Sequence, residues 1–486
     1  MSGKSEMGAN NPDGIRAIYE RWSGKTPERI VPLSAHGSSR KYYRITDDGN
    51  TVIGVNNDDR KENIAFLTFS RHFNNHGLPV PEIYEVDLEN GLFLQQDLGD
   101  DTLYTKLTAF TNKEGFSDRL TDIYRRVLDY LPGFQITAGA DLDYSVCYPR
   151  DRFDEQSIRW DLNYFKYYFL KFTDIAFDEQ ALEDDFGRFT AYLMQADHDY
   201  FMYRDLQSRN IMWHQDQPWF IDYQGGRRGA LQYDIASLLQ DAKAEIPWHV
   251  RDELLEYYIE SASRFIPIDR ENFMQYYFGY ALIRIMQAFG AYGLRGLHEG
   301  KSHFLRSISF AVHNLGGLLE RTRLPIDIPA LSTAWRQITA SDHLKQMGLA
   351  SLEGLAVHIR SFSFHHGIPQ DTSGHGGGFV FDCRILPNPG RLSEFAHMTG
   401  KDSSVIAFLQ QRAPVETFTD EVIHIIDQAI NHHLQRGFSD LSINFGCTGG
   451  QHRSVFLAEK AKKYIGERFK NVKVDLTHRE LERGDY

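Results

Sequence analysis

The sequence has few cysteines and no long apolar segment. Its 486 residues include three cysteines, Cys147, Cys383 and Cys447. So small and odd a number argues against a disulfide framework and favours a reducing compartment. No apolar run reaches the roughly 18 residues of a membrane span, and residues 1–14 lack the apolar stretch of a signal peptide. We therefore expect a cytoplasmic protein that does not use a membrane as a partner.

Zinc-binding patterns and basic charge are also scarce. The chain contains no C-x-x-C or H-E-x-x-H pattern, so short motifs do not predict zinc. The net charge is −13, and residues 351–486, with 15 basic and 16 acidic side chains, account for −1 of it. The preceding part is therefore too acidic for non-specific binding to nucleic acid. The last part also holds ten of the twenty histidines, a shift that indicates a domain boundary.

Length and composition predict a globular protein of two or three domains. The chain is 42% hydrophobic and 24% charged, and it is too long for a single core. The patterning predicts an α+β two-lobed protein-kinase-like fold, followed by a separate small α/β domain with an anion-binding strand-loop-helix. The expected parts are a flexible tail at 1–13, a lobe of antiparallel strands with one helix at 14–97, a helical lobe at 98–340, a linker at 341–352 and the last domain at 353–486.

The segment 203–224 carries the most informative spacing. Asp205 is followed five residues later by Asn210, and Asp222 comes after a short strand pair. One carboxylate can orient a hydroxyl group, while an amide and a second carboxylate hold Mg²⁺ against the phosphates of a nucleotide. Phosphoryl transfer depends mainly on positioning, so a few oxygen ligands at fixed spacing supply most of the mechanism. The same residues also fit a surface Asp, a turn Asn and a strand-end Asp.

The surrounding sequence favours the kinase interpretation. Strands are expected between residues 30 and 95, with a helix over 62–73 and a hinge at 97–100. The turn at Gly37–Ser39 could lay backbone N–H groups over phosphates, although a plain hairpin turn fits it equally. Aromatic runs such as 160–165 fit either core packing or a sugar-binding face. Further helices are expected over 117–138, 154–172, 178–197, 251–265 and, broken at its glycines, 271–321.

Five motifs together resemble the aminoglycoside phosphotransferase-like family, over roughly residues 14–340. They are Gly37–Arg44, Asp97–Asp100, Arg204–Asn210, Ile221–Gln224 and Tyr233–Leu239. Within this family the chain looks most like the anomeric sugar kinases of cell-wall recycling, which phosphorylate N-acetylmuramate or N-acetylglucosamine at C1.

The resemblance implies ATP and Mg²⁺ as cofactors. It also implies Asp205 as the catalytic base, Asn210 and Asp222 as the Mg²⁺ ligands, and Asp234 as a support of the catalytic loop. The residues implied at the nucleotide are Gly37, Ser38, Ser39, Lys41, Arg44, Glu62, Asp97 and Leu98, and the candidates for sugar contacts are Asp161 and Arg209.

The chain departs from the family pattern at Tyr203, in strand 52–57 and at Gly225-Gly226, where the family often has an acidic residue. Tyr203 stands where the family usually has His, and an aromatic donor could still brace the loop. Strand 52–57 lacks the lysine that grips the α- and β-phosphates, so we expect Lys41 or Arg44 to supply that charge, and Glu62 has no assured partner. A regulatory protein with a degenerate kinase half therefore stays open as an alternative, beside a kinase for another small hydroxylated substrate.

A second phosphate motif lies near the C-terminus. Strand 441–447 is followed by a glycine-rich loop and a helix over 454–469. Loop N–H groups and a helix N-terminus converge there, and Arg453 adds bidentate charge, so the motif predicts an anion site. The spacing of Cys447, Arg453 and Ser454 is also that of a cysteine phosphatase loop, which would make a thiolate nucleophile. A tight turn beside a buried cysteine fits the same residues, and no general acid is identified.

Residues 380–389 and 446–455 resemble the C-terminal domain of the RNase adapter protein RapZ, over roughly residues 353–486. The resemblance implies sensing of an amino-sugar phosphate and binding of small RNA. The family's basic tail is reduced here, in 477–486, so we do not expect RNA binding. A homo-oligomer formed through this domain is possible. The expected anion-site residues are Arg384, Asn388, Cys447, Thr448, Gly449, Gly450, His452, Arg453 and Ser454.

The motifs together predict an ATP-dependent kinase that phosphorylates an amino sugar at its anomeric hydroxyl group. The C-terminal domain is expected to bind a sugar phosphate or another anion and to regulate the kinase. A bifunctional kinase and phosphatase that uses Cys447 is a further alternative.

Overall fold

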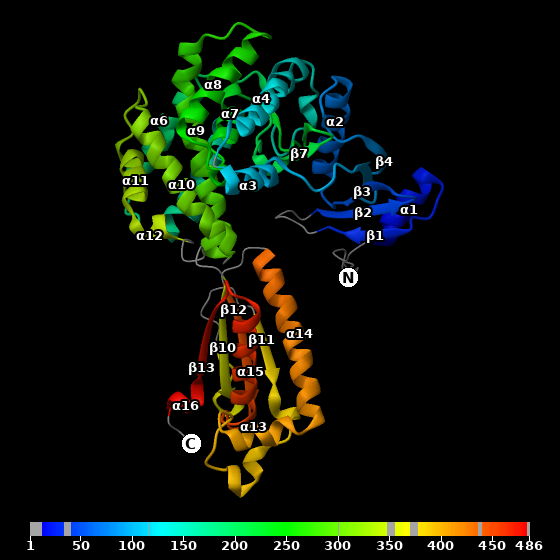
Figure 1. Cartoon of the computed structure of the whole chain (residues 1–486). Helices are drawn as coiled ribbons and strands as arrows, with labels where there is room; N and C mark the ends of the chain where they lie inside the picture. Colours follow the sequence, from blue (N-terminus) through cyan, green and yellow to red (C-terminus); the bar gives the residue numbers. More distant parts are fainter. Residues whose placement is uncertain are drawn as a thin grey trace, which may run out of the picture. The chain divides into compact units, whose positions relative to one another are not determined.

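The computed structural model describes residues 12–33, 40–114, 116–299, 301–347, 355–369, 378–435 and 440–483. The chain divides into two compact units (Figure 1). The first consists of Met1–Tyr167, Asp174–Gly290 and His313–Thr339, and the second of Tyr168–Thr173, Ala291–Val312 and Ala340–Tyr486. The domain boundaries expected from the sequence stay predictions. In the described ranges no helix is both long and apolar enough to cross a membrane.

The N-terminal part of the first unit is a five-stranded antiparallel sheet with strand order β1-β2-β3-β5-β4. Apolar side chains of α1 and of the strands, among them Ile15, Ile18, Ile45 and Leu94, form a buried cluster on this sheet. The bounds are α1 Pro12–Ser23, β1 Arg29–Pro32, β2 Lys41–Asp47, β3 Asn50–Asn56, α2 Arg60–Asn75, β4 Ile83–Asp87 and β5 Leu92–Gln96.

Helix α2 begins where the sequence supplies an N-cap. The carboxylate of Asp59 accepts hydrogen bonds from the backbone N–H groups of Lys61 and Glu62, which satisfies two of the donors that a helix start leaves open. Glu62 therefore lies in the first turn, and the buried face of the helix, including Phe66, Phe69 and Phe73, packs inward.

The larger part of the first unit is helical. Two short antiparallel pairs, β6–β9 and β7–β8, interrupt the helices and carry the segment 200–229. From residue 103 to residue 340 the bounds are α3 Leu103–Glu114, α4 Asp118–Pro132, η1 Gly133–Ala138, α5 Glu155–Tyr168, α6 Glu179–Leu193, β6 Tyr200–Met202, η4 Ser208–Asn210, β7 Ile211–His214, β8 Gln217–Phe220, β9 Arg227–Gly229, α7 Leu231–Leu239, α8 Trp248–Ser263, α9 Arg270–Tyr292, α10 Ser302–Arg321 and α11 Pro329–Ala340, and Ala291–Val312 within this range belongs to the second unit. This order of an antiparallel lobe and a helical lobe is the predicted two-lobed fold.

The long helical segment expected over 271–321 is interrupted, as its glycines indicated. α9 ends in a π-helical turn over Gly293–His298, and α10 begins at Ser302. A Cβ atom on Gly293 would lie 1.9 Å from the carbonyl oxygen of Tyr168, so only glycine allows this close approach.

The C-terminal domain in the second unit is a parallel four-stranded sheet with strand order β11-β12-β10-β13. Apolar residues of the strands and of α14 and α15 make one buried core, and these two helices run along the sheet in Figure 1. Register pairs Ser363 with Cys447, so the carboxyl ends of β10 and β12 meet at the same edge. The bounds are β10 Ala356–Ser363, β11 Gly378–Asp382, α13 Ser403–Gln410, α14 Ala413–Gln435, β12 Asp440–Cys447, α15 Arg453–Arg468, β13 Lys473–His478 and α16 Arg479–Arg483.

Candidate functional site

A buried carboxylate fixes the backbone of the loop that follows β6. Asp234, on α7, accepts hydrogen bonds from the N–H groups of Tyr203 at 2.8 Å and Arg204 at 3.0 Å, and from the side chain of Gln135 at 2.9 Å. Its side chain is fully buried, and this burial raises the pKa of Asp234 to about 7 against the opposing effect of the three donors. The loop is thereby held in the unusual conformation that gives Arg204 a φ of 82°.

Tyr203 links this loop to the strand end that carries Asp222. Its ring is fully buried, and its hydroxyl donates to the carbonyl oxygen of Ile221. Burial raises the pKa of Tyr203 well above its usual value, so the phenol stays a neutral donor. The geometry gives Tyr203 the bracing contact expected of an aromatic donor at this position.

The side chain of Asn210 joins the three residues of the central motif. The amide nitrogen of Asn210 donates to the carbonyl oxygen of Asp205 at 2.8 Å and to Oδ2 of Asp222 at 3.2 Å. Gln224 donates to the other oxygen of Asp222 at 2.8 Å. Burial, and then the nearby charges of Asp205 and Glu62, raise the pKa of Asp222, while Gln224 and Arg40 oppose the change. The cluster therefore concentrates oxygen atoms and negative charge.

Arg40 provides a cation beside this cluster that the motif analysis missed. Its side chain is 6% exposed. Its guanidinium group lies 2.5 Å from Oε1 of Glu62 and 3.6 Å from Oδ1 of Asp222. Asn57 donates to the other oxygen of Glu62 at 2.9 Å. Glu62 thus has the basic partner that the sequence left unassigned, although strand 52–57 has no lysine. The pairing joins the residue before β2 to α2, which no local spacing reveals.

The other residues predicted at the nucleotide have different surroundings. Arg44, expected at the phosphates, instead forms ion pairs with Asp97 at 2.6 Å and Asp100 at 2.9 Å. Burial raises the pKa of Asp97, but the hydrogen bonds from Arg44 and Gly99 outweigh it and hold the pKa below its usual value. Leu98 is buried in the same segment, and Lys41 begins β2 next to Arg40. Gly37, Ser38 and Ser39 lie outside the described residues.

The two candidates for sugar contacts have different surroundings. The carboxylate of Asp161, on α5, accepts hydrogen bonds from both terminal nitrogens of the Arg204 guanidinium, at 2.6 and 2.8 Å. The same guanidinium lies beside the rings of Phe153 and Tyr233, at 5.0 and 5.2 Å from their centroids. Asp161 therefore balances a buried charge in place of presenting an open carboxylate. Arg209 is exposed and donates to the side chain of Gln207 at 3.0 Å.

The predicted second site is a tight loop at the carboxyl end of β12. Gly450 has a φ of 73°, and a Cβ atom there would lie 2.4 Å from Cγ of Glu480, so glycine is required. The sulfur atom of Cys447 is 3.1 Å from the hydroxyl oxygen of Ser454, and Cys447 is 2% exposed. Thr448 and Gly449 are the exposed residues of the loop.

Arg453 directs its guanidinium group at backbone carbonyl oxygens. One terminal nitrogen donates to Arg384 at 3.1 Å and Leu386 at 3.0 Å, and the other to the hydroxyl oxygen of Thr448 at 3.3 Å. The buried Nε has no hydrogen-bond partner among the described residues. Arg453 thus stabilises the segment after β11, while its Nε–H group makes no hydrogen bond to the described residues.

The remaining residues of the predicted second site stabilise their own segments. The Arg384 side chain pairs with Asp382 at 2.6 Å, and its guanidinium lies 4.0 Å from the ring centre of Phe364. Asn388 accepts the N–H of Gly390 at 3.2 Å. The ring of buried His452 contacts the carbonyl oxygen of Phe395 at 2.9 Å.

A buried ion cluster supports the loop from the other side and was not predicted. Glu480, 2% exposed, accepts from the N–H of Ser363 at 3.1 Å, from Arg479 at 3.0 Å and from His366 at 2.7 Å. Burial raises the pKa of Glu480, but these donors outweigh it and hold the pKa below its usual value. Residues 477–486 were interpreted as a reduced basic tail, yet 473–478 form β13 and 479–483 form α16.

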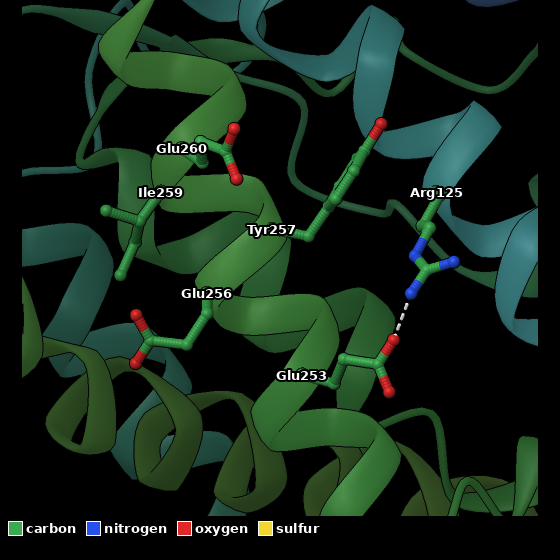
Figure 2. Close-up of a pocket in the computed structure, with 6 residues that line it drawn as sticks. All are labelled: Arg125, Glu253, Glu256, Tyr257, Ile259 and Glu260. Atoms are coloured by element: carbon green, nitrogen blue, oxygen red, sulfur yellow. Dashed lines mark hydrogen bonds and ion pairs between the residues drawn. The ribbon is translucent and has the colours of Figure 1, made fainter.

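A separate hollow lies between α4 and α8 (Figure 2). Figure 2 shows Arg125 of α4 directed toward Glu253 of α8, with the two side chains joined by an ion pair. None of its lining residues belongs to either predicted site. The lining residues are Arg125, Glu253, Glu256, Tyr257, Ile259 and Glu260.

Two family models match separate parts of the chain. Residues 29–269 match the phosphotransferase enzyme family, and residues 355–482 match the RapZ C-terminal domain. Both matches agree with the resemblances drawn from the motifs, and neither identifies the sugar-kinase subtype.

Curated relatives match about a quarter to a third of the chain. A nucleotide-binding protein of Acidobacterium capsulatum is 36% identical over 131 residues, which are 27% of this chain and 40% of that protein. One of Thermosipho melanesiensis is 40% identical over 125 residues, 26% of this chain and 42% of that protein. One of Methylococcus capsulatus is 35% identical over 177 residues, 36% of this chain and 56% of that protein. The chain thus spans about half the length of these relatives.

Solved structures of small-molecule kinases share a distant likeness. The choline kinase LicA from Streptococcus pneumoniae is 13% identical, with a TM-score of 0.42, and the match covers 64% of this chain and 100% of that one. An amicoumacin kinase is 14% identical, with a TM-score of 0.45, and the match covers 68% and 100% of the two chains. The fold assignment rests on the element order and the family match instead.

Proposed function

Through residues 29–269 the chain belongs to the phosphotransferase enzyme family, and from this membership we propose that it transfers the terminal phosphoryl group of ATP to a hydroxyl group of a small molecule. The observation that carries the proposal is the cluster of Asp205, Asn210 and Asp222, joined by the amide of Asn210 and supported by Asp234 and Tyr203. Rigid support of this kind is what a reaction governed by positioning requires.

In this proposal Asp205 orients the acceptor hydroxyl and takes its proton as the bond to phosphorus forms. The carboxylate lies in a loop whose backbone is held at Tyr203 and Arg204 by Asp234 and at its own carbonyl oxygen by Asn210. Its position is therefore fixed before a substrate arrives, which lowers the entropic part of the barrier.

The residues present fit a magnesium ion. Asn210 uses its amide nitrogen for protein contacts, which leaves its oxygen available, and Asp222 adds carboxylate oxygens. Amide and carboxylate oxygens are the hard ligands that Mg²⁺ prefers. Bound there with ATP, Mg²⁺ would neutralise charge on the phosphates.

We further propose that Arg40 takes the place of the absent strand lysine. It is held by Glu62 of α2 and lies near Asp222, which is the pairing that a phosphate-binding cation needs in order to stay oriented. A guanidinium presents several donors in one plane and suits phosphate oxygens.

The finer proposal is that the acceptor is an amino sugar of the N-acetylmuramate or N-acetylglucosamine type, phosphorylated at C1. Trp160 is 43% exposed on α5, one residue before Asp161, and an exposed indole next to polar groups suits a hydroxylated ring. The C-terminal domain is proposed to bind a sugar phosphate or another anion at the 447–454 loop, with the exposed Thr448 and Gly449 facing the ligand and Arg453 supplying positive charge beneath them. The second candidate, a kinase for another small alcohol, rests on the same cluster.

Phosphorus NMR with ATP, Mg²⁺ and a panel of amino sugars and other small alcohols tests both the general kinase proposal and the finer amino-sugar proposal. We expect a sugar 1-phosphate signal that Asp205→Asn reduces about 10²- to 10⁴-fold, the usual contribution of a general base. Asp216→Asn, in the exposed turn between β7 and β8, is the matched control and should keep full activity. Turnover of another alcohol alone would replace the amino-sugar proposal. Nucleotide binding without any turnover would favour the degenerate, regulatory alternative.

A further inference from the structure

Two histidines lie at the C-terminal end of α2, remote from Glu62: His72 in the last turn and His76 at the C-cap. His72 and His76 are one helical turn apart, and their rings are 4.4 Å between centroids. Residues spaced by four on a helix lie above one another. Neither residue takes part in the catalytic cluster or in the 447–454 loop, so the proposed function does not account for them.

Asp141, beyond the π-helical turn η1, completes the group. Its Oδ1 atom lies 3.2 Å from Nε2 of His76 and 3.5 Å from Nε2 of His72. One ligand atom from each of the three side chains lies within 4.8 Å of the other two. Zinc–nitrogen bonds of about 2.0–2.1 Å at tetrahedral angles place neighbouring ligand atoms about 3.3 Å apart. The two measured separations therefore match those of ligands on a common ion.

The hydrogen bonds around the group favour metal binding at one ring and oppose it at the other. Nδ1 of His76 is 3.0 Å from the carbonyl oxygen of His72, so it carries the proton and leaves the Nε2 lone pair free. Nε2 of His72 lies 2.8 Å from the carbonyl oxygen of Ala138. In the metal-free protein this nitrogen donates its proton to Ala138, and an incoming ion would have to displace that proton while meeting a carbonyl oxygen alongside.

The site is open to an ion from solvent. The exposed fractions of the side chains are 17% for His72, 25% for His76 and 65% for Asp141. The partly covered imidazoles supply the nitrogen ligands, and the exposed carboxylate completes the set from the solvent side. Two imidazoles and one carboxylate suit first-row divalent ions such as zinc and cobalt better than magnesium or calcium.

We propose that His72, His76 and Asp141 bind a divalent transition-metal ion, with zinc as the representative ion. The ion would join the C-terminal end of α2 to the segment after η1 and so restrain the helix that carries Glu62. Short zinc motifs do not predict this site, because the third ligand lies 65 positions after His76 (residues 76 and 141).

Cobalt titration of the full-length protein tests the proposal directly. After chelator treatment, Co²⁺ should give the visible absorption of a four-coordinate site in the wild type, and zinc in equal amount should abolish it. His76→Gln and Asp141→Asn should each weaken binding at least about tenfold, with one equivalent of bound metal lost. His249→Gln, an exposed histidine on α8, should leave both spectrum and stoichiometry unchanged. Equal binding by all four proteins would overturn the proposal.

A second measurement does not depend on the spectrum. Zinc should raise the unfolding midpoint of the wild type by mass action and leave that of Asp141→Asn unmoved. Because Asp141 is exposed, this variant is expected to fold. If zinc shifts neither protein, and Asp141→Asn lowers stability only at a pH where the imidazoles are charged, then the group is a plain histidine–aspartate ion pair and the proposal fails.

Discussion

The two candidate phosphate sites of this chain are built in opposite ways. In the phosphotransferase region, Asp205, Asn210 and Asp222 come from the segment 203–224, while Arg40 and Glu62 come from two other segments. In the C-terminal domain, one uninterrupted run from Cys447 to Ser454 supplies the loop. The first site collects oxygen atoms that suit a metal ion, while the second collects N–H donors that suit an anion.

A contiguous motif can therefore suggest the wrong activity, and a site whose residues come from separate segments can be missed in the sequence. The spacing of Cys447 and Arg453 suggests a phosphatase loop, yet the sulfur is buried against Ser454 and the guanidinium donates to the carbonyl oxygens of Arg384 and Leu386. A nucleophile needs access to its substrate, so the geometry favours anion binding over hydrolysis. Arg40, by comparison, lies inside the Gly37–Arg44 motif, and only the folded structure shows that it pairs with Glu62.

The largest expected effect separates the two sites by function. Asp222→Ala should lower the rate of phosphoryl transfer roughly 10³-fold, because a metal ligand supplies several kcal/mol of charge stabilisation. Cys447→Ser should leave that rate unchanged and should not alter any release of phosphate from an aryl phosphate. A coupled ATP assay and a chromogenic phosphatase assay on the same preparations provide the measurement. Loss of aryl phosphate hydrolysis in Cys447→Ser alone would restore the bifunctional alternative.

The next effect tests which cation serves the nucleotide. Arg40→Ala should raise the KM for ATP about 10- to 100-fold, because it removes a charge-assisted contact and leaves Glu62 unpaired. Arg40→Lys should recover part of the loss. Arg21→Ala, in an exposed ion pair on α1, is the control and should have wild-type kinetics. If Arg44→Ala has the large effect and Arg40→Ala none, then the original expectation for Arg44 is correct.

Acid should act on the C-terminal domain through two buried groups. Burial lowers the pKa of His478, so the unfolded chain takes up a proton first as pH falls through about 6.5. The pKa of Glu480 is also lowered, so its stabilisation is present above the unfolded value and is lost as pH falls through the folded value. Both shifts predict a progressive loss of stability on acidification.

Unfolding in urea at several pH values checks this prediction. All six tryptophans precede residue 336, so tryptophan fluorescence reports on the phosphotransferase region, while far-UV circular dichroism reports on both regions. We expect Glu480→Gln to cost about 2 kcal/mol at neutral pH, because three donors lose a charged acceptor, and to flatten the acid dependence of the transition seen only by circular dichroism. An unchanged acid dependence in this variant would contradict the assignment.

The smallest effect concerns the brace between the catalytic loop and the strand end. Tyr203→Phe should destabilise the phosphotransferase region by about 1 kcal/mol, because it leaves the carbonyl oxygen of Ile221 without its donor. Tyr233→Phe is a matched control, since the buried hydroxyl of Tyr233 has no partner among the described residues. The tryptophan-detected transition should shift for Tyr203→Phe and not for Tyr233→Phe. Equal shifts would show that the contact with Ile221 contributes nothing.

The sequence was informative wherever local spacing determines structure. The two-lobed fold, the strand-loop-helix at Cys447 and the spacing of Asp205 and Asn210 follow from patterns within short windows. The pairing of Arg40 with Glu62, the bidentate contact of Arg204 with Asp161 and the cluster around Glu480 join segments far apart in the chain. Such contacts depend on tertiary packing. Motif spacing can assign each of these residues to a helix, strand or loop, but it does not predict which partner the side chain contacts.

The buried phenol of Tyr203 has a consequence for how the catalytic loop responds to its surroundings. A histidine in that position would gain or lose a charge near neutral pH, whereas this tyrosine keeps its proton over the whole range in which cells operate. The contact between Tyr203 and Ile221 therefore carries no charge at pH 6 or at pH 8, whereas Asp234, whose pKa is raised to about 7, changes charge within this interval. A change of turnover within that interval can therefore be assigned to Asp234 or to the reacting groups, and not to the Tyr203 contact.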